Sequence, residues 1–214
     1  MEKTILDLGF QPLVNNLHKT KNEAINSKGY PLSASINSNL LIKLNHEVPA
    51  EKLYTNYLYK SSINKPYIDH CKDIWNSIKH RNPKIILDIG GNDGTLLKTF
   101  QKCSKEKLKL INVDASLSFK EENESANIEY INAFFNKDLD IPKADVITST
   151  NVFQHTKNIS KFLEGIKSHL GGIWVLEFPY TLRTFQTLQF DQFYHEHYYY
   201  WLLTPLVRIF SNLI

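Results

Sequence analysis

Short apolar runs alternate with helical patterns over the second half of the chain. Five β-prone runs stand at residues 85–89, 108–113, 128–131, 145–150 and 172–178. Between them, residues 95–102 and 159–170 carry apolar positions at helical spacing, and the pair Gly171-Gly172 follows the second as a candidate stop signal. Alternation of short strands with helices predicts a parallel sheet with crossover helices.

The first 82 residues have a different character. Residues 1–63 are rich in Asn, Leu and Lys without a clear period, whereas residues 66–80 place apolar side chains at near-helical spacing. We therefore expect a small N-terminal unit at 1–63, a connecting helix at 64–82 and an α/β domain at 83–214. Within that last domain, one further helix is expected at about 205–213.

Composition narrows the class of protein. The chain has 214 residues, which suits one large domain or a domain with a small appendage. Its net charge of +3 is slight and its lysines are scattered, whereas a nucleic-acid binder carries a denser basic stripe. No apolar stretch approaches the ~20 residues that cross a bilayer. We expect a cytoplasmic protein without a nucleic-acid or membrane partner.

A glycine-rich turn follows the first β-prone run, with Gly90, Gly91 and Gly94 close to two aspartates, Asp88 and Asp93. Glycines allow the backbone to approach a ligand, and the N-terminus of the next helix offers free N–H groups. The spacing misses the dinucleotide pattern G-x-G-x-x-G, and the carboxylates would repel a pyrophosphate. A cationic ligand without phosphate fits better, and S-adenosylmethionine is such a ligand. An ordinary structural turn is the alternative.

A second carboxylate supports a nucleoside ligand. Asp114 ends the second β-prone run, where it can accept hydrogen bonds from both hydroxyls of an adenosine ribose. The turn, this carboxylate and a third βα unit together favour a cofactor site.

Seven ordered segments resemble one family. They are DLGFQPLVNN at 7–16, YPL at 30–32, EKLYTNYLYKSS at 51–62, LDIGGNDGTLL at 87–97, TNVFQHTKNISKFL at 150–163, LEFPY at 176–180 and FDQFYHEHYYY at 190–200. In this order they resemble the S-adenosylmethionine-dependent sugar C-methyltransferases of the class I Rossmann-like type. The resemblance covers most of the chain and implies an α/β Rossmann-like methyltransferase core, S-adenosylmethionine as cofactor and a sugar nucleotide or other small molecule as substrate.

The resemblance also implies the members of a cofactor site. Gly90, Asn92 and Gly94 would shape the loop around the methionine part, with Asp88 beside them. Asp114 would hold the ribose. The remaining members are Ala133 and Phe134 at the adenine and Asn151 after strand four. Phe135 is expected to be an ordinary core aromatic residue.

The segment YHEH at 194–197 places two histidines around a glutamate. It lacks the H-E-x-x-H spacing of a zinc site and has no obvious third ligand, so no metal is expected. The family pattern places the segment beyond strand five, near the carboxyl edge of the sheet where open α/β folds bind substrates. We expect His197 to act as the base, with Glu196 orienting it or binding a sugar hydroxyl and Tyr194 as a second polar contact. Plain structural histidines remain the alternative.

In enzymes of this kind a keto group acidifies the neighbouring C–H, a base removes that proton, and the enolate attacks the methyl group of the sulfonium. A histidine suits this proton transfer. His195 is assigned to structure or substrate binding. Tyr57 and Tyr59 are candidates for a wall around the sugar nucleotide, or for packing. Glu177 is a candidate substrate ligand, or a solvated strand end.

Two departures from the family pattern stand out. Family members begin with a zinc module, whereas Ile36 and Asn39 occupy expected ligand positions here, and such side chains cannot bind zinc. Members also continue beyond HEHxxYF into a C-terminal domain, whereas this sequence stops at Ile214, so we expect a shortened C-terminus with a sheet that ends after strand five. An open sheet edge needs cover, which predicts either a homodimer or a weakened fold.

The acceptor stays open at this stage. The leading hypothesis is methyl transfer to a nucleotide-linked keto-deoxysugar or a related precursor of a surface polysaccharide such as a capsule. The alternatives are O-methylation of a sugar hydroxyl or of a small capsule-modifying group such as a phosphoramidate, and a catalytically silent relative that only binds cofactor or partners.

Overall fold

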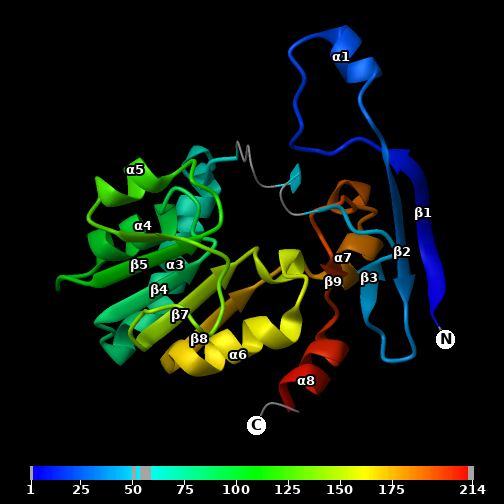
Figure 1. Ribbon diagram of the computed structural model, residues 1–214. Coiled ribbons are helices and arrows are strands. Elements are labelled where there is room, and N and C mark those ends of the chain that lie inside the picture. Colours follow the sequence, from blue (N-terminus) through cyan, green and yellow to red (C-terminus); the bar gives the residue numbers. More distant parts are fainter. Residues whose placement is uncertain (1, 50–51, 54–58, 212–214) are drawn as a thin grey trace. The chain divides into compact units, whose positions relative to one another are not determined.

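The computed structural model describes residues 2–49, 52–53 and 59–211, and most of its helices and strands are labelled in Figure 1. The chain divides into two compact units. The parallel-sheet unit contains residues 57–153 and 158–177, and the antiparallel unit contains residues 1–56, 154–157 and 178–214. These limits differ from the predicted domain boundaries because β9, near the C-terminus, pairs with strand β3 near the N-terminus. The division into functional domains stays a prediction.

Five parallel strands form the sheet of the first unit. They are β4 (Ile85–Ile89), β5 (Lys109–Asp114), β6 (Glu129–Asn132), β7 (Ala144–Thr150) and β8 (Leu170–Glu177), in the order β6-β5-β4-β7-β8. All neighbouring pairs are parallel, which confirms the predicted α/β sheet. The order reverses at β4, since β5 lies on one side and β7 on the other, and open α/β sheets bind ligands at the carboxyl ends of strands at such a point.

Helices of this unit follow the predicted pattern. They are α3 (Lys65–Ile78), α4 (Thr95–Cys103), α5 (Lys120–Glu124) and α6 (Ile159–His169), with short 3-10 turns η1 (Ser61–Ile63) and η2 (Lys79–Arg81). A third 3-10 turn, η3 (Phe153–His155), begins in this unit and ends in the other. α3 begins where the Asn64 side chain accepts a hydrogen bond from the Tyr67 N–H, and Pro66 lies in its first turn. Its apolar side packs into the core, where the Trp75 and Phe100 rings lie 5.4 Å apart.

The glycine pair after α6 has another role than the expected stop signal. α6 ends at His169 and β8 begins at Leu170, so Gly171 and Gly172 lie inside the strand. A Cβ atom on Gly172 would lie 2.2 Å from the Asp145 carbonyl oxygen. The glycine is therefore required because β7 and β8 approach closely there, at an irregularity in their register.

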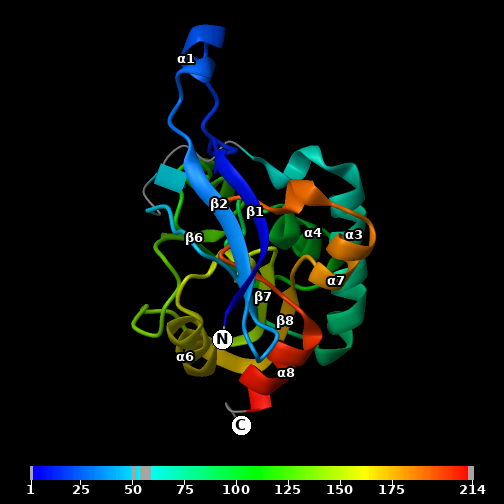
Figure 2. The same ribbon diagram turned by 90° about the vertical axis from the view of Figure 1, so that its right-hand side faces the viewer.

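An antiparallel sheet forms the second unit, in the order β1-β2-β3-β9. Its strands are β1 (Lys3–Gln11), β2 (Tyr30–Ile36), β3 (Ile42–Leu44) and β9 (Tyr199–Tyr200), and Figure 2 shows β1 and β2 side by side. The unit also contains α1 (Lys21–Ile25), α7 (Thr181–Gln186), η4 (Phe190–Gln192) and α8 (Leu203–Ser211). The sequence analysis assigned no strand to residues 1–63 and so missed β2, although apolar residues alternate with serines from Leu32 to Ile36.

The core of this unit joins both ends of the chain. Buried Leu32, Ala34 and Ile42 pack with Phe193 and Tyr200, and the last two rings stack at 4.4 Å. No helix in the described part of the chain is long and apolar enough to span a membrane.

Candidate functional site

The loop between β4 and α4 is held in an unusual backbone conformation. Gly90, Asn92 and Gly94 have φ angles of 64°, 52° and 74°. Only glycine adopts this left-handed region without cost, and asparagine tolerates it better than other residues. The loop therefore needs glycines at 90 and 94, and its role in binding a cofactor stays a prediction.

Two buried asparagines that the sequence analysis missed hold this loop. The Asn112 side chain accepts a hydrogen bond from the Gly91 N–H at 3.0 Å and donates to the Asn92 carbonyl at 3.1 Å. The Asn123 side chain donates to the same carbonyl at 3.0 Å. Both side chains are fully buried. The one signal in the sequence was a polar residue, Asn112, inside an apolar strand.

Asp114 lies at the end of β5, beside the loop. Its Oδ2 accepts the Asn92 N–H at 2.9 Å, and its Oδ1 accepts the Ser116 N–H at 2.8 Å. Burial raises the pKa of this carboxyl, although the two backbone hydrogen bonds oppose the shift. Each carboxylate oxygen keeps further lone-pair capacity, so the geometry fits two ribose hydroxyls.

The two aspartates of the loop have different surroundings. Asp88 is 1% exposed and accepts a hydrogen bond from the Thr148 hydroxyl at 2.7 Å. Burial raises its pKa to about 7, the Thr148 bond opposes this rise, and the charge of Asp114 adds to it. For Asp93, hydrogen bonds from Thr95 and Ser62 outweigh the effect of burial and lower its pKa. Asp93 accepts hydrogen bonds from the N–H and the hydroxyl of Thr95, the first residue of α4.

Three other predicted cofactor residues lie at the carboxyl ends of β6 and β7. The Ala133 N–H donates to the Asp114 carbonyl at 3.1 Å, and the neighbouring Phe134 side chain is 64% exposed. Phe135 packs its ring on Phe162 at 5.4 Å, as expected for a core aromatic residue. Asn151 has a left-handed φ of 57° and donates its N–H to the Glu177 carbonyl at 3.0 Å.

Residues of α3, which the sequence analysis treated only as a connecting helix, meet the ends of β7 and β8. The Tyr67 hydroxyl lies 3.0 Å from the Thr150 hydroxyl. His70 Nε2 lies 2.6 Å from Glu177 Oε1, so this candidate substrate ligand is paired with a histidine. Burial, followed by the charge of Asp88, raises the pKa of Tyr67.

Of the two candidate tyrosines of the substrate wall, Tyr57 lies outside the described residues. Tyr59 has a half-exposed side chain, and its carbonyl accepts a hydrogen bond from the Asn92 side chain at 2.9 Å.

In the antiparallel unit, His197 is 4% exposed and both of its ring nitrogens are hydrogen-bonded. Nδ1 lies 3.0 Å from the Gln192 carbonyl, which can only accept, so Nδ1 carries the proton and donates. Nε2 of the neutral ring then accepts from the Tyr194 hydroxyl at 2.6 Å. Burial, and secondarily His155, lowers the pKa of His197 to about 3.

His155 is a member of this cluster that the sequence analysis did not single out. Its ring lies 4.8 Å from the His197 ring in an edge-to-face arrangement, and its Nδ1 donates to the Glu196 carbonyl at 2.9 Å. Burial lowers its pKa to about 4. The sequence TNVFQHTKN gave no sign that this histidine would meet YHEH, because that contact is long-range.

Glu196 and His195 point to other partners. The Glu196 carboxylate is 3% exposed and accepts a hydrogen bond from the Asn15 side chain at 2.6 Å. Burial raises its pKa and the Asn15 bond opposes the rise. His195 Nε2 donates to the Tyr30 carbonyl at 3.2 Å. The group that orients His197 is thus the Gln192 carbonyl and not the Glu196 carboxylate. Glu196 contacts the histidine pair through its backbone carbonyl, which accepts from His155.

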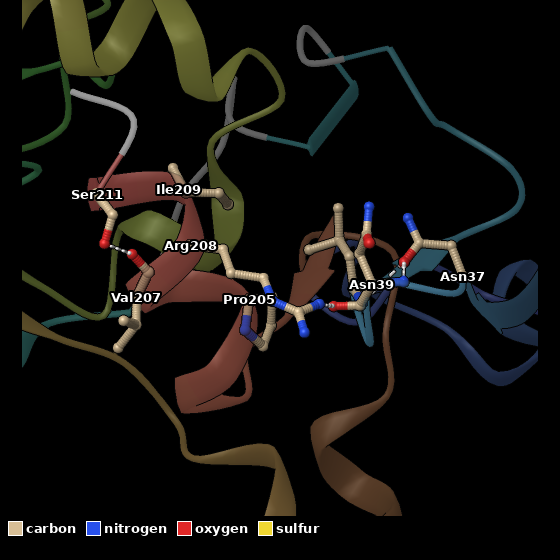
Figure 3. A pocket seen from close by; sticks show the side chains of 8 residues that line it. Asn37, Asn39, Pro205, Val207, Arg208, Ile209 and Ser211 are labelled. Atoms are coloured by element: carbon tan, nitrogen blue, oxygen red, sulfur yellow. Dashed lines mark hydrogen bonds between the residues drawn. The ribbon is translucent and has the colours of Figure 1, made fainter.

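A separate hollow of about 500 Å³ lies between the β2–β3 turn and α8, and it shares no residue with either cluster (Figure 3). Arg208 donates there to the Asn39 carbonyl at 3.5 Å. In the described part of the chain, no group of three or more His, Cys, Asp or Glu side chains is arranged to hold a metal ion.

Known proteins share this fold. C-methyltransferase NovU of Streptomyces niveus is 23% identical over 221 residues, which cover 97% of this chain and 52% of NovU. The chain therefore spans about half the length of this curated relative. The plantazolicin methyltransferase BpumL in complex with SAH matches with a TM-score of 0.53 and 17% identity, over 68% of this chain and 61% of that chain. YcgJ of Bacillus subtilis matches with a TM-score of 0.54 and 18% identity, over 67% of each chain.

The sequence of residues 63–213 matches a family described as a methyltransferase domain. The predicted class I methyltransferase fold is confirmed, and the match supports methyl transfer with S-adenosylmethionine as cofactor. Since the matched residues make up more than half of its length, the chain belongs to the methyltransferase-domain family.

Proposed function

We propose that this chain transfers a methyl group from S-adenosylmethionine to a carbon atom of a nucleotide-linked keto-deoxysugar, or of a related precursor of a surface polysaccharide, with His197 as the general base. Likeness to the C-methyltransferase NovU supports carbon as the methylated atom. The observation that carries the proposal is the fixed tautomer of His197, whose Nδ1–H is held by the Gln192 carbonyl.

The neutral ring supplies a proton acceptor. Because Nδ1 carries the proton, the lone pair of the ring stands on Nε2, where the Tyr194 hydroxyl now donates. Burial keeps the ring neutral at neutral pH. A negatively charged sugar nucleotide nearby would raise the pKa of His197 and strengthen it as a base. Since Nε2 has a single lone pair, the Tyr194 hydroxyl has to turn away from it before the proton transfer, and Tyr194 then serves as a second polar contact for the substrate.

The step balances without a further reactant. His197 Nε2 takes the proton from the C–H beside the keto group, and the electron pair of that bond becomes an enolate. S-adenosylmethionine, when bound, supplies a methyl group on a positively charged sulfur. The electron pair of the enolate forms the new C–C bond to the methyl group as the C–S bond breaks. The electron pair of the broken C–S bond stays on the sulfur of S-adenosylhomocysteine. The protein contributes position, deprotonation and exclusion of water.

Cofactor binding is assigned to the parallel-sheet unit. Asp114 would bind the ribose hydroxyls, and the conformation of its carboxylate supports this role. Asp88 would face the positive charges of the methionine part, near the loop of Gly90, Asn92 and Gly94. The exposed ring of Phe134, with Ala133 beside it, would border the adenine, and Asn151 would close the same edge.

Substrate roles are assigned to fewer residues. Tyr59 and Glu177 are proposed to contact the acceptor, since each lies in the parallel-sheet unit with part of its side chain exposed. His195 is assigned to structure, because it is 2% exposed and its Nε2 donates to the Tyr30 carbonyl. Glu196, held by Asn15, is proposed to bind a sugar hydroxyl after that amide gives way.

Solvent exchange separates this proposal from O-methylation. The protein is incubated in D₂O with S-adenosylhomocysteine and a nucleotide-linked 4-keto-6-deoxysugar, and deuterium at the carbon next to the keto group is followed by mass spectrometry and NMR. C-methylation predicts exchange that is lost in His197→Ala. Methyl transfer to this acceptor without exchange would contradict the proposal and favour O-methylation. A folded chain that binds no S-adenosylhomocysteine in calorimetry would favour a catalytically silent relative.

We also propose a homodimer that covers the edge of β8, which pairs only with β7 among the described strands. Its residues Gly171 and Gly172 are exposed. Light scattering coupled to size-exclusion chromatography is expected to give twice the mass of one chain. A monomer at high micromolar concentration would contradict this proposal.

A further inference from the structure

Four consecutive residues, 59–62, are bound to the cofactor loop or to α5. The Tyr59 carbonyl accepts from Asn92 Nδ2 at 2.9 Å, and the Ser61 N–H donates to Asn92 Oδ1 at 3.1 Å. The Ser62 N–H donates to Asp93 Oδ2 at 3.0 Å. The Lys60 ammonium forms an ion pair with Glu122 in α5. We call these four residues the 59–62 segment.

Asn92 stands between this segment and the proposed ribose site. Its backbone N–H donates to Asp114 Oδ2 at 2.9 Å, while its side-chain amide binds the segment. Its carbonyl accepts from the two buried asparagines, Asn112 and Asn123. Asn92 is 7% exposed, so all of its polar groups are satisfied inside the protein.

The backbone of Asn92 makes this arrangement sensitive to its partners. A φ of 52° is costly for a residue other than glycine, and it persists where surrounding hydrogen bonds over-determine it. A ligand on Asp114 changes the carboxylate that accepts the Asn92 N–H. Any adjustment of Asn92 is then transmitted to the Tyr59 carbonyl and the Ser61 N–H, because Asn92 is hydrogen-bonded to both of these groups as well as to Asp114.

We infer that Asn92 is a positioning residue that couples cofactor binding at Asp114 to the position of the 59–62 segment, and with it to the acceptor contact proposed for Tyr59. This inference rests on the proposed function. Coupling between two sites is reciprocal, so the bonds of the segment tighten cofactor binding as much as the cofactor steadies the segment. Loss of one hydrogen bond between Asn92 and the 59–62 segment is expected to weaken cofactor binding roughly two- to tenfold.

Calorimetric titration of the 214-residue chain with S-adenosylhomocysteine tests the coupling by a double-mutant cycle. Ser61→Pro removes the one N–H that donates to Asn92 Oδ1. Proline suits this place, since Ser61 is the first residue of η1 and Lys60 has extended backbone angles of φ −115° and ψ 126°. Asn92→Gly removes the amide and keeps a residue that tolerates positive φ. Ser61→Ala, which keeps the N–H, is the matched control.

We expect Ser61→Pro to weaken S-adenosylhomocysteine binding roughly two- to tenfold in the wild-type background and to have no further effect in Asn92→Gly. Ser61→Ala is expected to bind like the wild type. If Ser61→Pro weakens S-adenosylhomocysteine binding by the same factor in the Asn92→Gly background as in the wild type, the two residues are not coupled and the inference is overturned. A Ser61→Pro variant with unchanged affinity would overturn it as well. A wild-type chain that binds no S-adenosylhomocysteine would instead overturn the proposed function, and the coupling with it.

Trypsin cleavage after Lys60 gives a second readout that does not depend on the proline variant folding. S-adenosylhomocysteine is expected to slow this cleavage at least threefold in the wild type, and to have no effect on it in Asn92→Gly. Cleavage at the exposed Lys105, followed by mass spectrometry in the same samples, serves as the internal control. Equal slowing in both proteins would contradict the role of the Asn92 amide.

Discussion

The Tyr194 hydroxyl donates a hydrogen bond to His197 Nε2 at 2.6 Å, and the two rings lie 4.0 Å apart. A tight turn creates this pair, because the His197 N–H also donates to the Tyr194 carbonyl at 3.1 Å. Residues three apart thus face the same side. The order Tyr-His-Glu-His therefore sends its two histidines to different partners, and only the second reaches His155.

The first prediction concerns the base. His197→Ala is expected to lower methyl transfer by a factor on the order of 10²–10⁴, because it removes the proton acceptor, while S-adenosylhomocysteine affinity stays within about twofold. Single-turnover kinetics and calorimetry measure the two effects. Tyr194→Phe leaves His197 and its Nε2 in place and removes only a polar contact, so a smaller loss of methyl transfer is expected in this variant. Full turnover by His197→Ala would exclude it as the base.

Asp114→Ala is expected to weaken S-adenosylhomocysteine binding about tenfold or more, since hydrogen bonds to a charged group contribute about 1.5–3 kcal/mol. Asp114→Asn keeps one oxygen acceptor, so its affinity for S-adenosylhomocysteine should lie between those of Asp114→Ala and the wild type. Calorimetry measures all three, with Asp138→Ala as a control because that carboxylate is exposed in the same unit. Unchanged affinity in Asp114→Ala would move the ribose site elsewhere.

The buried histidine pair predicts a loss of stability in acid. Burial lowers the pKa of His155 to about 4 and of His197 to about 3, below the value of about 6.5 in an unfolded chain. Between these values the two histidines bind more protons in the unfolded chain, so their contribution to the free energy of unfolding falls as the pH falls from about 6.5 towards 4. Asp88, whose pKa burial raises to about 7, contributes in the opposite direction, so the histidine contribution is read from the difference between variant and wild type. The slope reaches about 1.4 kcal/mol per pH unit for each proton.

Urea unfolding at several pH values measures this slope. His155→Gln should flatten it, because one of the two groups is removed. An identical slope in His155→Gln and the wild type would show that this histidine does not bind protons on unfolding.

A pair of glycines with similar backbone angles separates strain from crowding. Gly94→Ala and Gly9→Ala both place a Cβ at a positive φ, of 74° and 66°, which costs about 1–2 kcal/mol. At Gly94 the new atom would also lie 2.4 Å from Asn123 Oδ1, whereas at Gly9 nothing lies within 4 Å. Gly94→Ala should therefore destabilise the chain by at least ~1 kcal/mol more. Equal denaturation midpoints would contradict the crowded geometry.

Periodicity predicted the parallel-sheet unit well, because its elements are short and each is decided by its own residues. The runs at 85–89, 128–131 and 145–150 became β4, β6 and β7 with shifts of a residue or so. The antiparallel unit was not predicted. Its strand β3 pairs with β9, more than 150 residues later, and no local pattern carries such a pairing.

The sequence by itself determined the α/β core, the glycine-rich loop after its first strand and the place of Asp114 at the end of the second, since each depends on residues that are neighbours along the chain. Tertiary structure alone decided that Asn112 and Asn123 hold the loop, that Asn92 holds the 59–62 segment, and that His155 meets His197. The physical reason is burial. A polar side chain removed from water must find a partner, and the folded chain, through contacts between distant residues, selects which partner it finds.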